Sequence, residues 1–435
     1  MPLLVGLKLA HLKKKCTRFK DYFMKKMSSS SPQGHTGSAR ELESLEMKLI
    51  YVSPEGTSGY ARVAEDFMLG LHELGLEFSW QPYHWAGGET VPFRGETENV
   101  ALKPFFYKPL ESPELVVLHI MPSYLESWLE RFPSTPIVVH TVWETDRLRG
   151  EWVEVINRTL GVVVPCEWNR QVFAQSGVTV PIEVVPYMIP KDVKPLERGN
   201  SCRRFYTIND WTYRKAMPEL VEAFLRAFAD GGATLTIKTN TKDRTAAKPW
   251  YDFFPLGWLA TIHTSTSHAL KELKRATSSE AEINLIAGDL TREQILEIHR
   301  EHDCYVSLTR SEGWGMGAFE AAAIGNPVVM TGFGGQSEFL KPELCTLVDH
   351  SMKPCLDDGW YTARESWAEP DVEDAVVKLR EVFAQPDQAH AKARLLREKC
   401  WAEYEQGKVA AEYRQTLQRL LRDRLRAGLE PGSPG

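Results

Sequence analysis

The sequence lacks the features that mark several classes of protein. It has no apolar run near the ~18 residues that a membrane-spanning helix needs. Its net charge of −6 gives no basic field for a nucleic acid. The seven cysteines include no Cys-x-x-Cys pair, and no two histidines have metal-ligand spacing. We therefore expect a cytoplasmic chain with reduced cysteines, no membrane crossing, no nucleic-acid partner, no metal site and no cofactor.

Composition and length favour a globular protein with two domains. Hydrophobic residues make up 43% of the chain and charged residues 25%, so the chain can bury a core and stay in solution. A length of 435 residues is enough for two domains with separate cores. Neither a fibrous nor a disordered protein is expected.

Residues 1–27 differ from the rest of the chain. Lysine and arginine are frequent there, and Asp21 is the one acid. Apolar residues from Val5 to Phe23 recur at spacings of three and four, so a helix would carry an apolar stripe on a basic background. That profile is typical of a helix on a membrane surface and predicts peripheral membrane contact. A functionless extension, joined by a serine-rich linker at 28–46, explains the composition equally well.

From Met47 onward, strand-like apolar runs alternate with helix-like segments. The first run is KLIYV, and a turn at Ser58 and Gly59 leads into an amphipathic helix that closes at Gly75. Such alternation favours parallel sheets in an α/β protein. Further strands are expected at 115–118, 136–140, 161–164, 204–208, 234–238, 283–287 and 304–307.

Prolines at 181, 186, 190 and 195 indicate a linker between two domains. One helix, at 268–277, is expected in the less regular stretch from 240 to 282. The predicted divisions are an extension at 1–46, an N-terminal domain at 47–197, a C-terminal domain at 198–388 and a helical tail at 389–435.

The most informative segment is SEGWGMGAFEAAAIGNPVV, which follows a strand-like run at 303–309. Seven residues separate Glu312 from Glu320, and they include three glycines, Gly313, Gly315 and Gly317. The helix should begin near Met316, so the N–H groups of its first turn would face a docked anion. Both carboxylates would reach the same cleft, Glu312 from the loop and Glu320 from the helix. The segment predicts a site for a phosphate with a hydroxylated neighbour.

Three other interpretations of the glycine loop are weaker. A P-loop needs Gly-Lys-Ser/Thr at the start of the helix, and here the glycines lead into Ala318 and Phe319. A dinucleotide fingerprint needs Gly-x-Gly-x-x-Gly and an acid after the next strand, which here ends in glycines. A turn that serves only close packing would not favour two flanking acids.

Residues 282–340 resemble the donor-binding half of retaining glycosyltransferases of the GT-B architecture, of the group 1 or family 4 type. The shared signature is Glu, seven residues, Glu, a small-residue helix, Gly-x-Pro-Val and a Gly-Gly loop, here Gly334 and Gly335. The resemblance implies two Rossmann-like domains facing across a cleft, with the last helix crossing back to the first domain. It also implies that Glu312 contacts hydroxyls of the donor sugar and that Glu320 holds the ribose diol. Gly317 departs from the pattern, because relatives often have proline there.

The resemblance assigns roles to residues outside this segment. Lys215, which precedes an amphipathic helix, would neutralise the departing diphosphate, with its neighbour Arg214 pointing away as a secondary candidate. Asn209 stands where relatives usually have an arginine, so the neutralisation would be shared differently. His140, at a strand end, would contact or position the sugar, or serve as a structural hydrogen-bonding group. Gly59 would approach the donor phosphates from the N-terminal domain.

The resemblance therefore implies a glycosyltransferase that moves a sugar from a UDP- or GDP-sugar, with retention and without an obligatory metal. The acceptor is an unidentified glycan, lipid or small molecule, contacted by loops such as 78–89. Glu144 and Asp146 are interpreted as acceptor-side or structural residues. A nucleotide-sugar epimerase and a catalytically inactive sugar-nucleotide-binding protein on the same scaffold are the alternatives.

Overall fold

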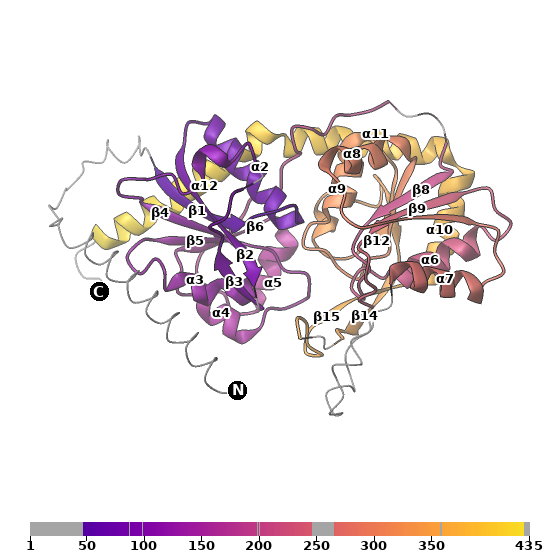
Figure 1. The fold of residues 1–435 in the computed structure, drawn as a ribbon, viewed down its shortest axis with the longest axis horizontal. Helices are drawn as coiled ribbons and strands as arrows, with labels where there is room; N and C mark the ends of the chain where they lie inside the picture. The colour runs from indigo at the N-terminus through magenta and orange to yellow at the C-terminus, as the bar shows by residue number, and fades with distance from the viewer. Residues whose placement is uncertain are drawn as a thin grey trace, which may run out of the picture. The chain divides into compact units, whose positions relative to one another are not determined.

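The computed structural model describes residues 47–86, 88–97, 99–197, 199, 201–245, 265–356 and 359–429. These residues form two parallel-sheet α/β halves, coloured indigo to magenta and magenta to orange in Figure 1. This confirms the predicted fold class. The predicted basic helix at 1–27 and the linker at 28–46 lie outside the described residues.

The first sheet has the strand order β3-β2-β1-β4-β5-β6-β7. All neighbouring strands in it are parallel except β2 and β3, which form a hairpin. The strands are β1 (Lys48–Pro54), β2 (Glu77–Ala86), β3 (Glu89–Pro92), β4 (Leu115–His119), β5 (Ile137–His140), β6 (Gly161–Val164) and β7 (Ile182–Val184). The helices are α2 (Gly59–Glu73), α3 (Leu125–Leu129), α4 (Gly150–Ile156) and α5 (Glu167–Gln175). Runs such as GVVV are fully buried, as expected for parallel strands that are covered on both faces.

The second sheet is parallel throughout, with the order β10-β9-β8-β11-β12-β13. The strands are β8 (Arg204–Ile208), β9 (Thr234–Thr239), β10 (Glu282–Ala287), β11 (Cys304–Ser307), β12 (Val328–Thr331) and β13 (Thr346–Val348). The helices are α6 (Met217–Ala227), α7 (Thr266–Ala276), α8 (Arg292–Glu301), α9 (Met316–Ile324) and α10 (Val372–Ala384). Strands β14 (His350–Pro354) and β15 (Ser366–Pro370) form a separate antiparallel pair. Each sheet has its own apolar core, dominated by Val, Leu, Ile and Phe side chains.

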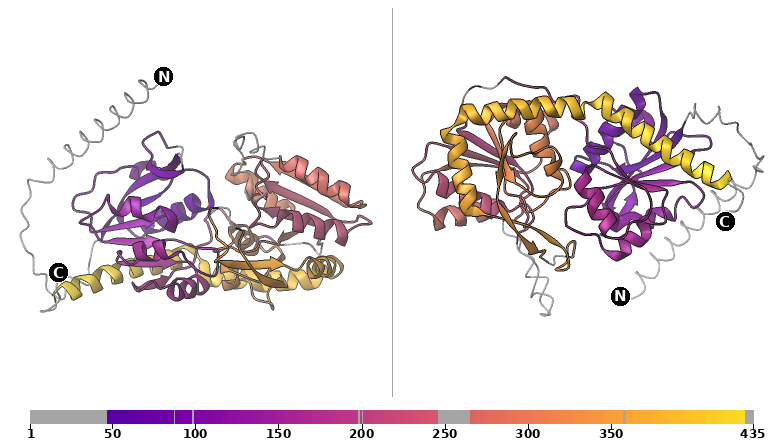
Figure 2. Two further views of the ribbon diagram at one scale, coloured as in Figure 1. Left: turned by 90° about the horizontal axis from the view of Figure 1, so that it is seen from below. Right: turned by 180° about the vertical axis from the view of Figure 1, so that it is seen from behind.

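The last two helices, α11 (Pro386–Tyr404) and α12 (Gln406–Leu429), run from the second half back to the first, as Figure 2 shows from behind. In the first half, α12 packs against α2. Arg414 Nη1 donates to Leu74 O at 3.2 Å, and a Cβ on Gly70 would lie 2.8 Å from the Cβ of Ala410. Because Gly70 has no side chain, α2 and α12 can approach each other closely at this point. The predicted crossing of the C-terminal helix to the first half is confirmed.

Two sequence-based expectations were wrong. Residues 78–89, expected to be an acceptor loop, lie mostly in β2 and its hairpin with β3. The strand sequence, EFSWQPYHWA, alternates polar and apolar residues on both sides of Pro82, and this strand pattern was overlooked. The proline-punctuated linker contains the short strand β7, which pairs with β6 at the edge of the sheet, a place where flanking prolines are tolerated.

Candidate active site

The glycine loop between β11 and α9 forms the helix N-terminus that the sequence predicts. Helix α9 begins at Met316, and Gly315 precedes it with φ of 92°, a conformation that favours glycine. No side chain caps the helix. The N–H groups of its first turn therefore have no intrahelical acceptor and carry the positive end of the helix dipole. This part of the loop can bind an anion.

The other glycines allow close approach. A Cβ on Gly313 would lie 1.9 Å from Val142 Cγ2, and one on Gly335 would lie 1.8 Å from the carbonyl oxygen of Gly313. The segment after β5 thus packs directly on the glycine loop. At Gly317 a Cβ would lie 2.6 Å from the hydroxyl oxygen of Tyr305. The phenol occupies the space that a larger residue would need, which gives a physical reason for the glycine.

Lys215 and Arg214 both contact Glu312. Lys215 Nζ forms a short ion pair with Oε1 of Glu312, and Arg214 Nη1 lies 3.3 Å from Oε2. Arg214 Nη1 also donates to Ser311 O at 2.5 Å. The expectation that Arg214 points away from the site was therefore wrong. Both cations lie in the turn before α6, where Ala216 has a left-handed conformation, so helical spacing does not apply to them.

Burial and charge oppose each other in this cluster. The side chains of Arg214, Lys215 and Glu312 are only 17%, 15% and 10% exposed. Burial alone would raise the pKa of Glu312, but the charges of Lys215 and Arg214 outweigh it and hold that pKa below its usual value. Burial lowers the pKa of Lys215 despite the attraction of Glu312. The cluster holds an ionised carboxylate between two cations.

Glu320 lies on α9 and is 7% exposed. Its Oε1 accepts from Arg292 Nη1 at 2.6 Å, and its Oε2 lies 3.3 Å from His299 Nε2. Arg292 also forms a two-pronged pair with Asp192, with both distances 2.8 Å. Burial would raise the pKa of Glu320, but the His299 hydrogen bond and the charge of Arg292 lower it. Sequence reasoning did not identify these partners of Glu320.

His140 is fully buried at the end of β5. Its Nδ1 is 3.1 Å from Tyr413 Oη of α12, and its ring stacks on His119 with centroids 4.2 Å apart. Burial lowers the pKa of His140 to about 3, so the ring is neutral at pH 7. Within the described part of the chain, none of these contacts joins His140 to Lys215 or Glu312. Its role at the sugar stays a prediction.

Among the described residues, no hydrogen bond or ion pair joins Asn209 or Gly59 to Glu312, Lys215 or Arg214. Asn209 Nδ2 donates to the hydroxyls of Thr207 at 2.9 Å and Ser307 at 3.1 Å, so its amide lies across the ends of β8 and β11. Gly59 is exposed at the first position of α2, behind the capping hydroxyl of Ser58. A Cβ on Gly59 would meet nothing within 4 Å. Packing does not require glycine there, and its ligand role remains a prediction.

The structure adds one residue to the cluster. Glu144, from the segment after β5, places Oε1 3.5 Å from Arg214 Nη2, and its Oε2 accepts from Tyr361 Oη at 3.3 Å. The sequence signal was the acidic pair after the strand end. It did not show that Glu144 reaches a cation of the other half, because that contact depends on how the two halves pack.

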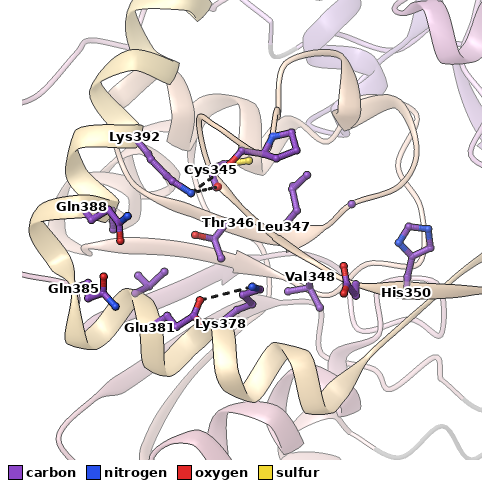
Figure 3. Close-up of a pocket in the computed structure, with 15 residues that line it drawn as sticks. Cys345, Thr346, Leu347, Val348, His350, Lys378, Glu381, Gln385, Gln388 and Lys392 are labelled. Carbon is purple, nitrogen blue, oxygen red and sulfur yellow. Dashed lines mark hydrogen bonds and ion pairs between the residues drawn. The ribbon is translucent and has the colours of Figure 1, made fainter.

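A separate cavity of about 400 Å³ lies between β13, α10 and α11, and none of the predicted site residues lines it (Figure 3). Its two lysines have partners: Lys392 Nζ donates to Cys345 O at 3.2 Å, and Lys378 lies 3.7 Å from Glu381. The cavity is therefore distinct from the Glu312 cluster.

Three further observations concern the described residues alone. No group of His, Cys, Asp and Glu side chains there is arranged to hold a metal ion. The six cysteines described there are buried. No helix among them combines the length and apolarity needed to cross a membrane.

Comparison with known proteins agrees with the fold. Residues 265–351 match the family model described as glycosyl transferases group 1. The fold is similar to HepE of Anabaena in complex with UDP-glucose, with 12% identity, a TM-score of 0.61, and coverage of 86% of this chain and 100% of HepE. Sucrose-phosphate synthase of Thermosynechococcus elongatus gives 12% identity, a TM-score of 0.59, and coverage of 87% and 100%. The pneumococcal O-GlcNAc transferase GtfA, in complex with UDP and GlcNAc, gives 9% identity, a TM-score of 0.55, and coverage of 86% of this chain and 99% of GtfA. No curated protein matches the sequence.

Proposed function

We propose that this chain, which has the GT-B fold and a group 1 glycosyl transferase region, transfers a sugar from a nucleotide-sugar donor to an acceptor. The observation that carries the proposal is the pair of cations, Lys215 and Arg214, on Glu312 beside the uncapped start of α9. A leaving diphosphate develops negative charge in the transition state, and preorganised cations and backbone N–H groups stabilise that charge. Lys215 is the proposed principal cation.

In this mechanism the two glutamates bind different parts of the donor. Glu312, on the loop, would accept hydrogen bonds from the sugar hydroxyls. Glu320, inside α9, would hold the ribose diol while keeping Arg292 or His299 as a partner. A carboxylate has about four acceptor positions, so ribose and Arg292 can share Glu320.

We propose a uridine nucleotide as the donor's carrier, because HepE and GtfA are similar folds with UDP or a UDP-sugar bound. We also propose retention of the anomeric configuration, which rests on the resemblance of residues 282–340 to retaining enzymes. We propose transfer without an obligatory metal, because Lys215 and Arg214 can supply positive charge to a diphosphate. Peripheral membrane contact through residues 1–27 is a separate proposal, based on composition alone.

Binding and turnover experiments test the proposal in sequence. Isothermal calorimetry with UDP, GDP and ADP should show saturable binding of UDP above the other two. A panel of UDP-sugars, first ranked by thermal shift, should then give slow hydrolysis of one donor and fast transfer once an acceptor is found. Isomerisation of the donor without acceptor would instead identify an epimerase. Absence of binding for all nucleotides would contradict the proposed function.

Retention and metal use need their own measurements. Proton NMR of the first-formed product should show the anomeric coupling of the donor, and an inverted product would contradict retention. Activity should persist in excess EDTA. Loss of activity that Mg²⁺ or Mn²⁺ restores would overturn transfer without a metal.

A further inference from the structure

One guanidinium is shared by carboxylates from the two halves of the protein. Arg214 Nη1 lies 3.3 Å from Oε2 of Glu312, and Arg214 Nη2 lies 3.5 Å from Oε1 of Glu144. Glu312 belongs to the loop after β11, whereas Glu144 belongs to the segment after β5. Glu144 therefore brings a negative charge from the N-terminal half to a cation of the proposed donor site.

The charges in this cluster balance. Arg214 and Lys215 provide two positive charges, and Glu144 and Glu312 provide two negative charges. Their side chains are 10–17% exposed, so water screens the charges only weakly. A nucleoside diphosphate that enters here meets no net positive charge from these four side chains while both carboxylates remain. It must compete for the cations.

The two carboxylates differ in how firmly they are held. Glu312 contacts both cations. Glu144 has one longer contact to Arg214, and its other oxygen accepts from the hydroxyl of Tyr361. Glu144 is therefore the carboxylate that a phosphate can replace at Arg214 with the smaller loss of contacts.

We infer that Glu144 is a positioning residue that competes with the nucleoside diphosphate for Arg214 and so limits how tightly the product is held. With the site empty, Glu144 keeps the guanidinium in place and neutralised. With the diphosphate bound, Glu144 gives up Arg214 and stays beside Tyr361. After transfer, its return to Arg214 favours release of the diphosphate. The inference rests on the proposed function and concerns the same site.

The test uses UDP as the probe and the full chain as the protein. Glu144→Gln keeps the shape of the side chain and an acceptor for Tyr361, but removes the charge that repels UDP. We expect the Kd for UDP to fall by about tenfold, which corresponds to about 1.4 kcal/mol. The inhibition constant of UDP as a product should fall in parallel. Glu144→Asp, which keeps the charge, should return both constants toward the wild-type values.

Asp146→Asn is the matched control. Asp146 lies two residues away, is 31% exposed and contacts Arg147 and the backbone N–H of Ser366 instead of Arg214. The Asp146→Asn substitution removes one negative charge from the same segment as Glu144→Gln and should leave the Kd for UDP unchanged. Thermal melting of all variants checks that they are folded.

The outcomes separate this inference from the proposed function. If wild-type protein binds no UDP, the proposed function fails and the inference fails with it. If wild-type protein binds UDP but Glu144→Gln binds it equally or more weakly, the inference alone is overturned. Equal tightening in Glu144→Gln and Asp146→Asn would also overturn it, because the effect would then be one of general charge.

Discussion

Arg214 and Lys215 are neighbours with different structural surroundings, and their alanine variants should therefore differ. Arg214 donates to Ser311 O at 2.5 Å and lies within 3.5 Å of both Glu312 and Glu144. Burial disfavours its charge, but Tyr361 and the two glutamates raise its pKa overall, so the folded protein favours the charged form. Lys215 contacts Glu312 alone among the ion pairs described, and burial lowers its pKa.

The expected magnitudes follow from these surroundings. Arg214→Ala removes the shared partner of two carboxylates that are 10% and 17% exposed, and breaking such a buried pair costs about 3–5 kcal/mol. For a domain of about 200 residues, each kcal/mol lost from the free energy of unfolding lowers the melting temperature by about 2–4 °C, so the melting temperature of Arg214→Ala should fall by at least about 6 °C. Lys215→Ala leaves Glu312 paired with Arg214 and leaves the contact of Glu144 unchanged, so its free energy of unfolding should fall by less than that of Arg214→Ala. Its turnover should nevertheless fall by about 100- to 1000-fold.

The assay compares thermal melting with steady-state turnover of the donor found by screening. Arg147→Ala is the control, because Arg147 is an arginine of the neighbouring segment that is 57% exposed and pairs with Asp146 at 3.7 Å. It should resemble the wild type in both measurements. If Arg214→Ala melts at the same temperature as Lys215→Ala, the assignment of Arg214 as the shared structural partner is refuted. If Lys215→Ala retains full turnover, Lys215 does not face the leaving group.

Four further predictions test other parts of the site. Glu320→Gln should weaken UDP binding by about 1.5–3 kcal/mol for each charge-assisted hydrogen bond lost, whereas Glu312→Gln should not weaken it; equal losses by calorimetry would refute the different roles. The pKa values of both glutamates are lowered in the folded protein, so their stabilisation is present above the unfolded pKa of about 4.3 and is lost as pH falls through the folded values. The melting temperature should therefore fall as the pH is lowered below about 4, and it should fall less steeply in Glu320→Gln than in the wild type. Equal slopes of melting temperature against pH in the two proteins would refute this linkage. Gly317→Ala should cost about 1–3 kcal/mol through its contact with the Tyr305 hydroxyl, and Tyr305→Phe should recover part of that loss in denaturant titrations of the double variant. Deleting residues 1–46 should abolish binding to anionic vesicles while leaving soluble-acceptor activity intact, and unchanged vesicle sedimentation would rule out a membrane anchor.

The sequence determined the parts of this protein that depend on local pattern. The runs at 161–164, 204–208 and 304–307 became strands β6, β8 and β11 at the predicted bounds, because buried parallel strands are short, continuous apolar segments. Helix α9 begins at Met316 as predicted, because the glycine loop and the small-residue run that follows define its start. The resemblance in the same segment identified the GT-B fold, and the comparisons confirm it. These features depend on residues that are close together in the chain.

Only the tertiary structure decided which side chains meet. Arg214 was expected to point away, yet the turn before α6 directs it to Glu312, and the packing of Val142 on Gly313 brings the segment of Glu144 to the other half. Arg292 and His299, the partners of Glu320, come from α8, and the short contact of Gly317 with Tyr305 comes from β11. Ion pairs form over a few ångströms, often between residues that are far apart in the sequence. The sequence therefore shows which charged residues are present, whereas the packing of helices and strands determines which of them form pairs.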